Sequence, residues 1–381
     1  MKYDKNKSPQ DKDRMLYEIA FAFLKGRSTC EIAAEINRRH RVRMTREEVY
    51  PALRKAVELD MLLFNPPTDL YMRERLAQFP NKGDIVVVNA EDDFASSGVS
   101  LAAAEKVLQL IREIAARSPG RQVHLGLGVG LTTKDFFIRL VMLLRHDEKI
   151  PPLVIHELSA SFSFWTPEET PAAYSTYLSR PFKVHDRDAS PSFVGMASAP
   201  FFPAETYDEK VKDLMLQRAL AEKKDIDIIV TSLGSLGTRC EDGYLHQYLT
   251  KFPEGLTKFP EGALDELLKQ GARGDVQLRP YSDAGPLRIE HGPKPVTLFE
   301  IHELVDFTRN KGKHVVLICG PCRRCGEIKK GALLPLLREP SLGFWNHLVV
   351  DLGTAHALLP ELPAPSEDAQ SPTGRRRRKS A

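Results

Sequence analysis

The chain has 381 residues, of which 42 % are apolar and 28 % charged, and it contains five cysteines. This composition is typical of a globular protein with two or more domains, and it excludes a disulfide scaffold and a disordered chain. No apolar run reaches the ~18 residues of a membrane span, and the charged N-terminus lacks the apolar core of a secretory signal, so we expect a cytoplasmic protein.

The net charge of +3 is unevenly distributed along the chain. Residues 1–64 hold 14 Lys/Arg and 10 Asp/Glu, and the segment 375–379, "RRRRK", adds five positive charges. The rest of the chain is therefore acidic. Basic ends on an acidic body favour a polyanionic partner at the ends rather than over the whole surface.

Residues 14–66 are predicted to form a small helical domain after a disordered stretch at 1–13. Apolar residues at helical spacing and two capping-box patterns, Ser28 with Glu31 and Thr45 with Glu48, mark its helices. We expect helices over residues 14–24, 28–37 and 45–58, a connection over 38–44 and a short strand over 61–64.

A cluster of arginines at 38–46 favours a DNA-binding helix-turn-helix domain, in which helix 45–58 reads the major groove. Cations placed against phosphates release counterions and so favour binding. The candidate DNA contacts are Arg38, Arg39, Arg41, Arg43, Thr45, Arg46, Glu47, Tyr50 and Arg54. The stretch "VYPALRKAVELDMLLF" resembles the recognition helix of winged-helix regulators of the PadR kind. Pro51 within it removes one backbone hydrogen bond and favours a kink.

After a linker helix predicted over residues 67–80, the pattern over 81–360 changes to that of an α/β domain. Short apolar runs alternate with helical stretches, which indicates a doubly wound, mostly parallel sheet with helices on both faces. The runs are "DIVVVN", "RQVHLGLG", "PPLVIHEL", "DIDIIVTSLG", "KHVVLICG" and "NHLVVDLG". Residues 361–381 are predicted to be a disordered basic tail.

Three of these runs end in small residues, which favours a phosphate site. Ligands of open α/β sheets bind beyond the carboxyl ends of the strands, where glycines admit an anion and helix N-termini offer N–H groups. Threonine hydroxyls and arginines supply further donors and charge. The candidates for effector binding are Gly128, Gly130, Thr132, Thr133, Gly234, Ser235, Arg239, Gly320, Arg323, Arg324 and Lys329.

Six motifs follow one another over about residues 68–360 in an order known from one family. They are "MRERLAQF" with "DIVVVN", "GLGVGLTT", "DIDIIVTSLGSL", "GDVQLRPYSDAG", "ICGPCRRCGEI" and "LVVDLGTA". In this order they resemble the sugar-binding domain of SorC-type transcription regulators, which are grouped with DeoR-type sugar-phosphate sensors. The resemblance implies a double-stranded DNA partner, a phosphorylated sugar effector and a homo-oligomer, either dimer or tetramer. We expect no cofactor.

The resemblance also implies roles for particular residues. Thr132 and Thr133 would hold a phosphate together with the Gly128–Gly130 backbone. Arg324 stands where the family has a lysine, and Pro321 stands where it has a glycine. Asp283 and Asp351 match the family's acids and would accept hydrogen bonds from hydroxyl groups.

Three alternatives remain open from the sequence. Cys319, Cys322 and Cys325 are spaced as C-x2-C-x2-C and could hold zinc or an iron–sulfur cluster, with Cys240 as fourth ligand, or sense redox state. The body also resembles ribose-phosphate isomerases and amino-sugar-phosphate deaminases, for which Asp242, Asp283 or His246 would supply acid–base chemistry. The basic head could also bind RNA or an acidic protein.

Overall fold

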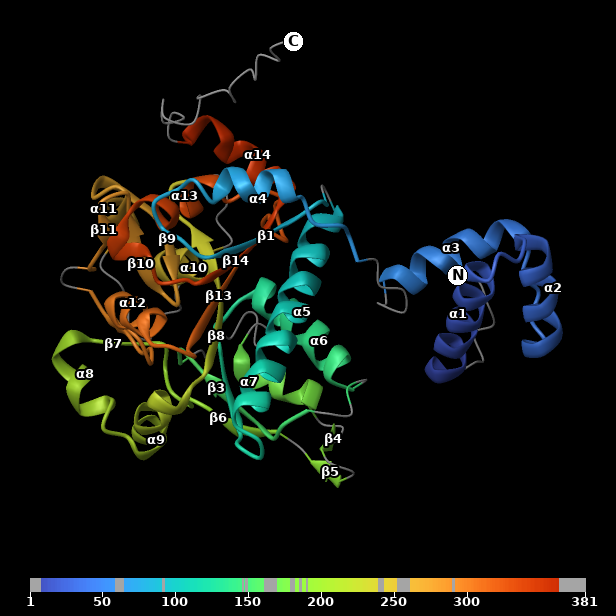
Figure 1. Ribbon diagram of the computed structural model, residues 1–381, viewed down its shortest axis with the longest axis horizontal. Helices are drawn as coiled ribbons and strands as arrows, with labels where there is room; N and C mark the ends of the chain where they lie inside the picture. Colours follow the sequence, from blue (N-terminus) through green and yellow to red (C-terminus); the bar gives the residue numbers. More distant parts are fainter. Residues whose placement is uncertain are drawn as a thin grey trace, which may run out of the picture. The chain divides into compact units, whose positions relative to one another are not determined.

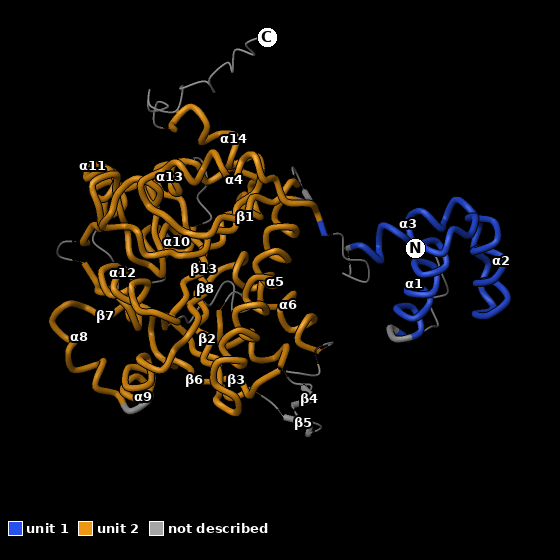
Figure 2. The backbone as a smooth tube through the Cα atoms, viewed as in Figure 1, with its two compact units in different colours: residues 1–65 blue, residues 66–381 orange. Residues whose placement is uncertain are grey.

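The computed structural model divides the chain into two compact units, Met1–Asn65 and Pro66–Ala381, shown in blue and orange in Figure 2. It describes residues 8–58, 65–90, 93–145, 147, 150–160, 170–178, 182–184, 187–189, 191–238, 243–251, 261–289 and 292–362. Within these ranges no helix has both the length and the apolar character needed to cross a bilayer.

The first unit consists of three helices around one apolar core. They are α1 (Pro9–Leu24), α2 (Thr29–His40) and α3 (Arg46–Glu58). Their shared core is formed by Met15, Leu16, Ile19, Ile32, Ala33, Ile36, Met44, Val49 and Ala52. The strand expected over residues 61–64 lies outside the described residues.

Helix α1 begins earlier than the sequence pattern indicated, so the disorder predicted up to residue 13 is wrong for residues 9–13. The Ser8 hydroxyl accepts a hydrogen bond from the Asp11 backbone N–H at 3.2 Å, and Pro9 occupies the first turn. Both residue types are favoured at these positions, because the cap satisfies a free N–H and proline has none to satisfy.

Helix α2 has the expected capping box of Ser28 and Glu31, but it runs on to His40. Arg38 and Arg39 therefore lie in its last turn and not in the connection predicted over residues 38–44. Positive side chains at this end interact favourably with the helix dipole, which offsets the repulsion between them. Arg41, with φ of +51°, then turns the chain out of the helix.

The second unit is built on a parallel sheet with the strand order β1–β14–β13–β8–β2–β3–β6 (Figure 1). Every neighbouring pair in this series is parallel, which confirms the predicted α/β fold class. The strands are β1 (Asp84–Val88), β2 (Val123–Leu127), β3 (Leu153–Glu157), β6 (Ser192–Val194), β8 (Ile228–Ser235), β13 (His314–Cys319) and β14 (His347–Asp351).

Helices cover both faces of this sheet and enclose two cores. One core is formed with α5 (Asp93–Arg117), α6 (Leu131–Arg145) and α7 (Pro171–Tyr174). The other is formed with α4 (Leu70–Leu76), α9 (Leu214–Glu222), α12 (Ile301–Arg309), α13 (Lys330–Arg338) and α14 (Leu352–Leu358). In β13, Val315 and Leu317 enter the second core, while Val316 and Ile318 enter the first. Because both faces are buried, the strands are apolar throughout.

Smaller elements extend the sheet and cover its edges. An antiparallel series of β9 (Ala272–Val276), β10 (Arg279–Ser282) and β11 (Gly285–Pro286) continues from the end of β8. Two separate pairs are β4 (Phe182–Val184) with β5 (Arg187–Ala189), and β7 (Phe201–Phe202) with β12 (Lys294–Pro295). The remaining helices are α8 (Ala204–Lys210), α10 (Tyr244–Lys251), α11 (Ala263–Lys269) and the 3-10 turns η2 (Ser175–Leu178), η3 (Lys223–Asp225), η4 (Pro340–Leu342) and η5 (Leu359–Glu361).

The helix predicted as a linker, α4, is an integral part of the second unit. Met72 and Leu76 from α4 and Phe79 beyond it are at most 1 % exposed and belong to one of the two cores. The backbone also joins the sheet just before α4, through a bridge between Thr68 and Val88. Apolar residues at a spacing of four and three explain why the segment packs onto the body instead of standing free.

The direction of winding reverses between β2 and β8. From β2 the chain proceeds outward through β3 and β6, whereas from β8 it proceeds the other way through β13 and β14. Ligands of open α/β sheets bind in the crevice at the carboxyl ends of the strands at such a switch point.

Two histidine pairs link neighbouring strands of the sheet; His156 is fully buried and the other three rings are half-buried. His124 Nδ1 lies 2.9 Å from His156 Nε2, and His314 Nδ1 lies 3.0 Å from His347 Nε2. Burial lowers the pKa of His156 and the pKa of His347 to about 4. Both imidazoles are therefore neutral in the folded protein at pH 7.

We expect the stability of the second unit to fall as pH decreases from about 6.5 to 4. An unfolded histidine has a pKa of about 6.5, so in this window the unfolded state binds more protons and acid favours it. Asp275 and Asp351 act in the opposite direction, because burial raises their pKa values, that of Asp275 to about 6. Burial lowers the pKa values of all four paired histidines, so the histidines dominate. Urea unfolding at pH 7.5 and pH 5 measures the effect. His156→Gln should reduce the difference, and an equal pH response in this variant would contradict the assignment.

Candidate effector site and nucleic-acid interface

A cavity lies at the switch point, beyond the carboxyl ends of β2 and β8. It brings together three segments that are far apart in the sequence: the turn into α6, the end of β8 and the loop after β13. The lining residues are Val129, Gly130, Leu131, Thr132, Ser232, Leu233, Gly234, Ser235, Gly243, Tyr244, Asp275, Gln277, Cys322, Arg323, Arg324 and Lys329.

The first wall of the cavity is the N-terminus of α6. The Lys134 N–H donates to the Gly130 carbonyl at 2.9 Å, so the preceding N–H groups, from Leu131 onward, have no acceptor within the helix. Gly130 has a φ of +110°, which side-chain-bearing residues rarely adopt. Its carbonyl also accepts a hydrogen bond from the buried Tyr174 hydroxyl at 2.9 Å, a contact that the sequence did not suggest. The free N–H groups of this turn are thus available to bind an anion.

The structure separates the two threonines that were predicted to act together. Thr132 lines the cavity. Thr133 is fully buried, and its hydroxyl donates to Ser232 Oγ at 3.4 Å. Gly128 has a packing role, because a Cβ there would lie 2.8 Å from Thr231 Oγ1.

The second wall is a continuation of β8 and not the loop that the glycines suggested. Gly234 pairs with Asp275 and Ser235 pairs with Gly274 in an antiparallel ladder with β9. A side chain at Gly234 would collide with the Asp275 carboxylate, so the glycine admits that acid to the cavity. Arg239, predicted to bind the effector, lies outside the described residues.

The third wall is the turn at residues 321–326. The Gly326 N–H donates to the Cys322 carbonyl at 2.8 Å and closes the turn. Arg323 forms an ion pair with Asp135 of α6, while Arg324 also lines the cavity. Lys329 Nζ donates to the Leu233 carbonyl at 2.8 Å and so ties this segment to β8.

The cysteines of this loop do not form a metal site in the part of the chain that the structure describes. Cys319 is fully buried in a core, and burial raises the pKa of its thiol to about 12. Cys322 is half-buried and Cys325 is exposed. The described residues contain no group of three or more His, Cys, Asp or Glu side chains placed to hold a metal, and Cys240 lies outside them.

Besides Gly128 and Thr133, two predicted acids and Gly320 are not among the described residues that line this cavity. Asp283 is exposed on the β10–β11 hairpin, where it forms an ion pair with Arg273 at 2.8 Å. Asp351 is buried and caps α14, with its carboxylate accepting from the Thr354 N–H at 2.8 Å and hydroxyl at 2.7 Å. It lines a second cavity on the other side of the 321–326 turn. Gly320 packs against Val99 of α5. Motif order along a chain does not tell on which side of a loop a residue will lie.

The two buried polar lining residues that sequence reasoning missed are Asp275 and Gln277. Each is at most 5 % exposed. Asp275 Oδ1 and both polar atoms of the Gln277 amide are buried without a hydrogen-bond partner among the described residues. Gln277 and Leu278 form the β9–β10 turn with φ of +49° and +65°. Two-residue turns with positive φ favour Asn-Gly. The unusual glutamine at this position was therefore the one feature of the sequence that could have identified the residue.

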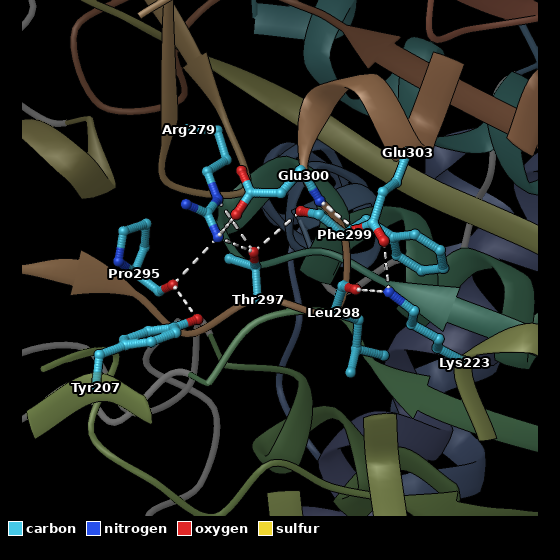
Figure 3. A network of polar contacts seen from close by, with 9 residues as sticks. All are labelled: Tyr207, Lys223, Arg279, Pro295, Thr297, Leu298, Phe299, Glu300 and Glu303. Atoms are coloured by element: carbon cyan, nitrogen blue, oxygen red, sulfur yellow. Dashed lines mark hydrogen bonds and ion pairs between the residues drawn. The ribbon is translucent and has the colours of Figure 1, made fainter. Parts of the chain in front are cut away.

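A polar network anchors the strand that follows this turn (Figure 3). The guanidinium of Arg279 donates to the Thr297 hydroxyl at 2.8 Å and the Pro295 carbonyl at 3.2 Å, and pairs with Glu300 at 2.7 Å. Lys223 continues the network by pairing with Glu303 at 2.8 Å. The network fixes the start of β10 to the segment before α12.

Replacing Arg279 with leucine is expected to destabilise the second unit by about 2–4 kcal/mol, because the buried Thr297 hydroxyl loses its donor and the Glu300 carboxylate loses its ion pair. The matched control is Arg218→Leu, which removes an exposed arginine from a pair with Glu222 within α9 and should change stability little. Denaturant unfolding compares the two. Equal losses would show that the network does not hold the turn.

The described residues that line this cavity do not include His246 or an acid–base pair of the kind expected for an isomerase or deaminase. Asp275 is the only acid among the described lining residues, and no histidine is among them. Asp242 lies outside the described residues, and Asp283 lies on the surface hairpin.

In the first unit, α3 presents one exposed polar face. Arg46, Tyr50 and Arg54 recur every four residues and are exposed, whereas Val49 and Ala52 face the core. Glu47 is also exposed and pairs with Arg46 at 2.6 Å. The helix continues through Pro51. The face is thus polar and exposed, as a helix that enters the major groove of DNA requires.

The connection into α3 is held in place by an amide that the sequence reading did not identify. The Asn37 side chain donates to the Met44 carbonyl at 2.9 Å and accepts from its N–H at 2.6 Å. Arg41 and Arg43, between them, are exposed. Thr45 immediately precedes α3, and its N–H donates to the Glu48 carboxylate at 2.8 Å.

The two arginines at the end of α2 differ in their surroundings. Arg38 is exposed. Arg39 pairs with Glu35 at 2.6 Å and with Glu18 at 3.5 Å. Its charge is therefore largely compensated, and Arg39 is a weaker candidate for a phosphate contact than Arg41 or Arg43.

No sequence-family model matches the chain. No curated protein matches it in sequence either. Solved structures do share its fold. The full-length sorbitol operon regulator SorC from Klebsiella pneumoniae superposes with a TM-score of 0.54 at 15 % identity, over 92 % of this chain and 99 % of that one.

Two further structures match over about three quarters of the chain. A transcriptional regulator from Streptococcus pneumoniae TIGR4 has a TM-score of 0.53 at 17 % identity, covering 76 % of this chain and 95 % of its own. A DeoR family transcriptional regulator from Listeria monocytogenes has a TM-score of 0.51 at 14 % identity, covering 75 % and 98 %. At these identities the likeness is one of fold.

Proposed function

We propose that the protein is a DNA-binding transcription regulator whose second unit binds a phosphorylated sugar. One observation carries the proposal: the cavity at the switch point combines the N-terminus of a helix, the Thr132 hydroxyl and three cationic side chains from distant segments. The same fold is found in solved regulators of transcription, one of them a sorbitol operon regulator.

The charges of the cavity favour a phosphate group over a neutral ligand. Arg323, Arg324 and Lys329 line it, and Asp275 is the one acid among the described lining residues. Asp135 compensates Arg323 from the side of α6. Backbone N–H groups and a helix dipole add to the positive potential, as in other phosphate-binding loops.

The first unit supplies the DNA-binding part of the proposal. The exposed face of α3 and the exposed Arg41 and Arg43 provide base-reading and phosphate-binding groups, respectively. We infer that the regulator acts in the cytoplasm as a homo-oligomer, because paired half-sites need paired heads. Effector binding would then alter the arrangement of subunits and thereby the affinity for the operator.

The test measures DNA affinity of the full-length chain with and without sugar phosphates. Because the operator sequence is unknown, the DNA used is a set of duplexes that the protein has selected from a random-sequence pool. At least one member of a broad panel of pentose, hexose and alditol phosphates should change affinity by about tenfold, corresponding to ~1.4 kcal/mol of coupling. Sequence-independent binding without any effector response would contradict the proposal and favour a general polyanion-binding protein.

A further inference from the structure

We propose that Asp275 and Gln277 form a hydroxyl-recognising pair, which selects a polyhydroxylated phosphate ester over an alkyl phosphate. The inference rests on the proposed effector role of the cavity and extends it to the neutral end of the ligand. Both side chains line the cavity, and they stand on either side of Val276 at the β9–β10 turn.

The unused hydrogen-bonding capacity of the pair points to a ligand. Asp275 Oδ1, Gln277 Oε1 and Gln277 Nε2 are buried and have no partner among the residues that the structure describes. A buried polar atom without a hydrogen-bond partner reduces the free energy of unfolding by about 1–3 kcal/mol, so three such atoms at one wall of a cavity are unusual. The amide both donates and accepts, as a hydroxyl group does, so vicinal hydroxyls match this wall better than an alkyl chain.

The backbone holds the amide in place at a conformational cost. Gln277 and Leu278 both have positive φ, which disfavours side-chain-bearing residues. Leu278 is 1 % exposed and packs in the core formed with α10 and α11. The following residue, Arg279, is anchored by its side chain in the network of Figure 3. A strained turn fixed on both sides presents a preorganised side chain to the cavity.

Charge orients the ligand along the cavity. The α6 N-terminus, Arg323 and Arg324 attract the phosphate. The Asp275 carboxyl would repel a second anion and is left to face the uncharged carbons and their hydroxyls. Burial raises its pKa to about 6, so the carboxyl is mostly ionised at pH 7 and accepts hydrogen bonds from hydroxyl groups. The two ends of the cavity thus suit the two ends of a sugar monophosphate.

The experiment compares Gln277→Leu with the wild-type full-length chain by calorimetric titration. The probes are inorganic phosphate, hexyl phosphate and the panel of pentose, hexose and alditol monophosphates. Wild type should bind the best panel member about tenfold or more tightly than hexyl phosphate, and Gln277→Leu should lower this ratio about tenfold. Affinity for inorganic phosphate should stay unchanged. Gln277→Asn, which keeps an amide and tolerates positive φ, should retain part of the preference.

Two controls separate the possible failures. Gln270→Leu alters an exposed glutamine of the same unit and should leave every affinity unchanged. Unfolding midpoints establish that the variants are folded. An unchanged ratio in folded Gln277→Leu, or no preference in wild type, overturns this inference while phosphate binding persists. Absence of binding to every probe, inorganic phosphate included, overturns the proposed function as well.

Discussion

Replacing Arg41, Arg43 and Arg54 together by alanine is expected to lower the affinity of the full-length chain for duplex DNA by about 10²–10³-fold near 0.1 M salt. All three side chains are exposed, on the connection and on the polar face of α3. The slope of log affinity against log salt concentration should also fall by about 2–3, because up to three phosphate contacts are lost. Fluorescence anisotropy across a salt series measures both quantities.

Arg14→Ala is the matched control for this result. Arg14 is an exposed arginine of the same unit, but it lies on α1 and pairs with Glu18. Its loss should leave the affinity and the salt slope close to those of wild type. The triple variant removes three charges and Arg14→Ala removes one. If the loss of DNA affinity for each removed charge were equal in the two, DNA would bind to a diffuse basic surface and not to the connection before α3 and α3 itself.

The second large effect is expected at the phosphate end of the cavity. Thr132→Val combined with Arg324→Ala should weaken phosphate-ester binding by about 10²–10³-fold, because each residue offers a hydrogen bond to a charged group worth about 1.5–3 kcal/mol. DNA affinity without effector should be preserved, so the variant would bind its operator but no longer respond. Ligand titration and DNA binding with and without effector measure these outcomes.

Thr133→Val provides an adjacent and isosteric comparison. The Thr133 hydroxyl is buried and donates to Ser232 Oγ, and Thr133 itself is not among the described residues that line the cavity. Its removal should cost some stability but leave ligand affinity within about threefold of wild type. Equal losses of ligand affinity for Thr132→Val and Thr133→Val would show that the phosphate does not sit at this turn as proposed.

The fold class could be predicted because local patterns determine it. The apolar runs of β8 and β13 are continuous since both faces of these strands are buried, and that feature is visible in the sequence. The boundaries were less predictable: α2 continues to His40 because its terminal cations suit a helix end. Strand order was not predictable either, because it depends on pairing between distant segments.

The candidate site shows the same division between local and distant information. The three glycine-containing segments could be recognised one by one, and the structure brings all three to one cavity. Asp283 and Asp351 could be recognised as acids beside strand ends. Asp283 instead pairs with Arg273 and Asp351 accepts from Thr354, so neither carboxylate lines the cavity. Gln277 escaped notice because its significance lies in a buried turn with unpaired amide atoms, which no residue pattern reveals.

The ion pair between Arg323 and Asp135 has a consequence for selectivity among anions. A carboxylate already neutralises this guanidinium, so an incoming anion must compete with an internal counter-ion before it gains the full attraction. A singly charged ion such as chloride gains little from that exchange, whereas a doubly charged group gains enough to displace or share the arginine. Monovalent anions such as chloride would thus bind weakly in the cavity even when abundant. The ion pair would thereby increase the preference of the cavity for doubly charged anions over singly charged ones.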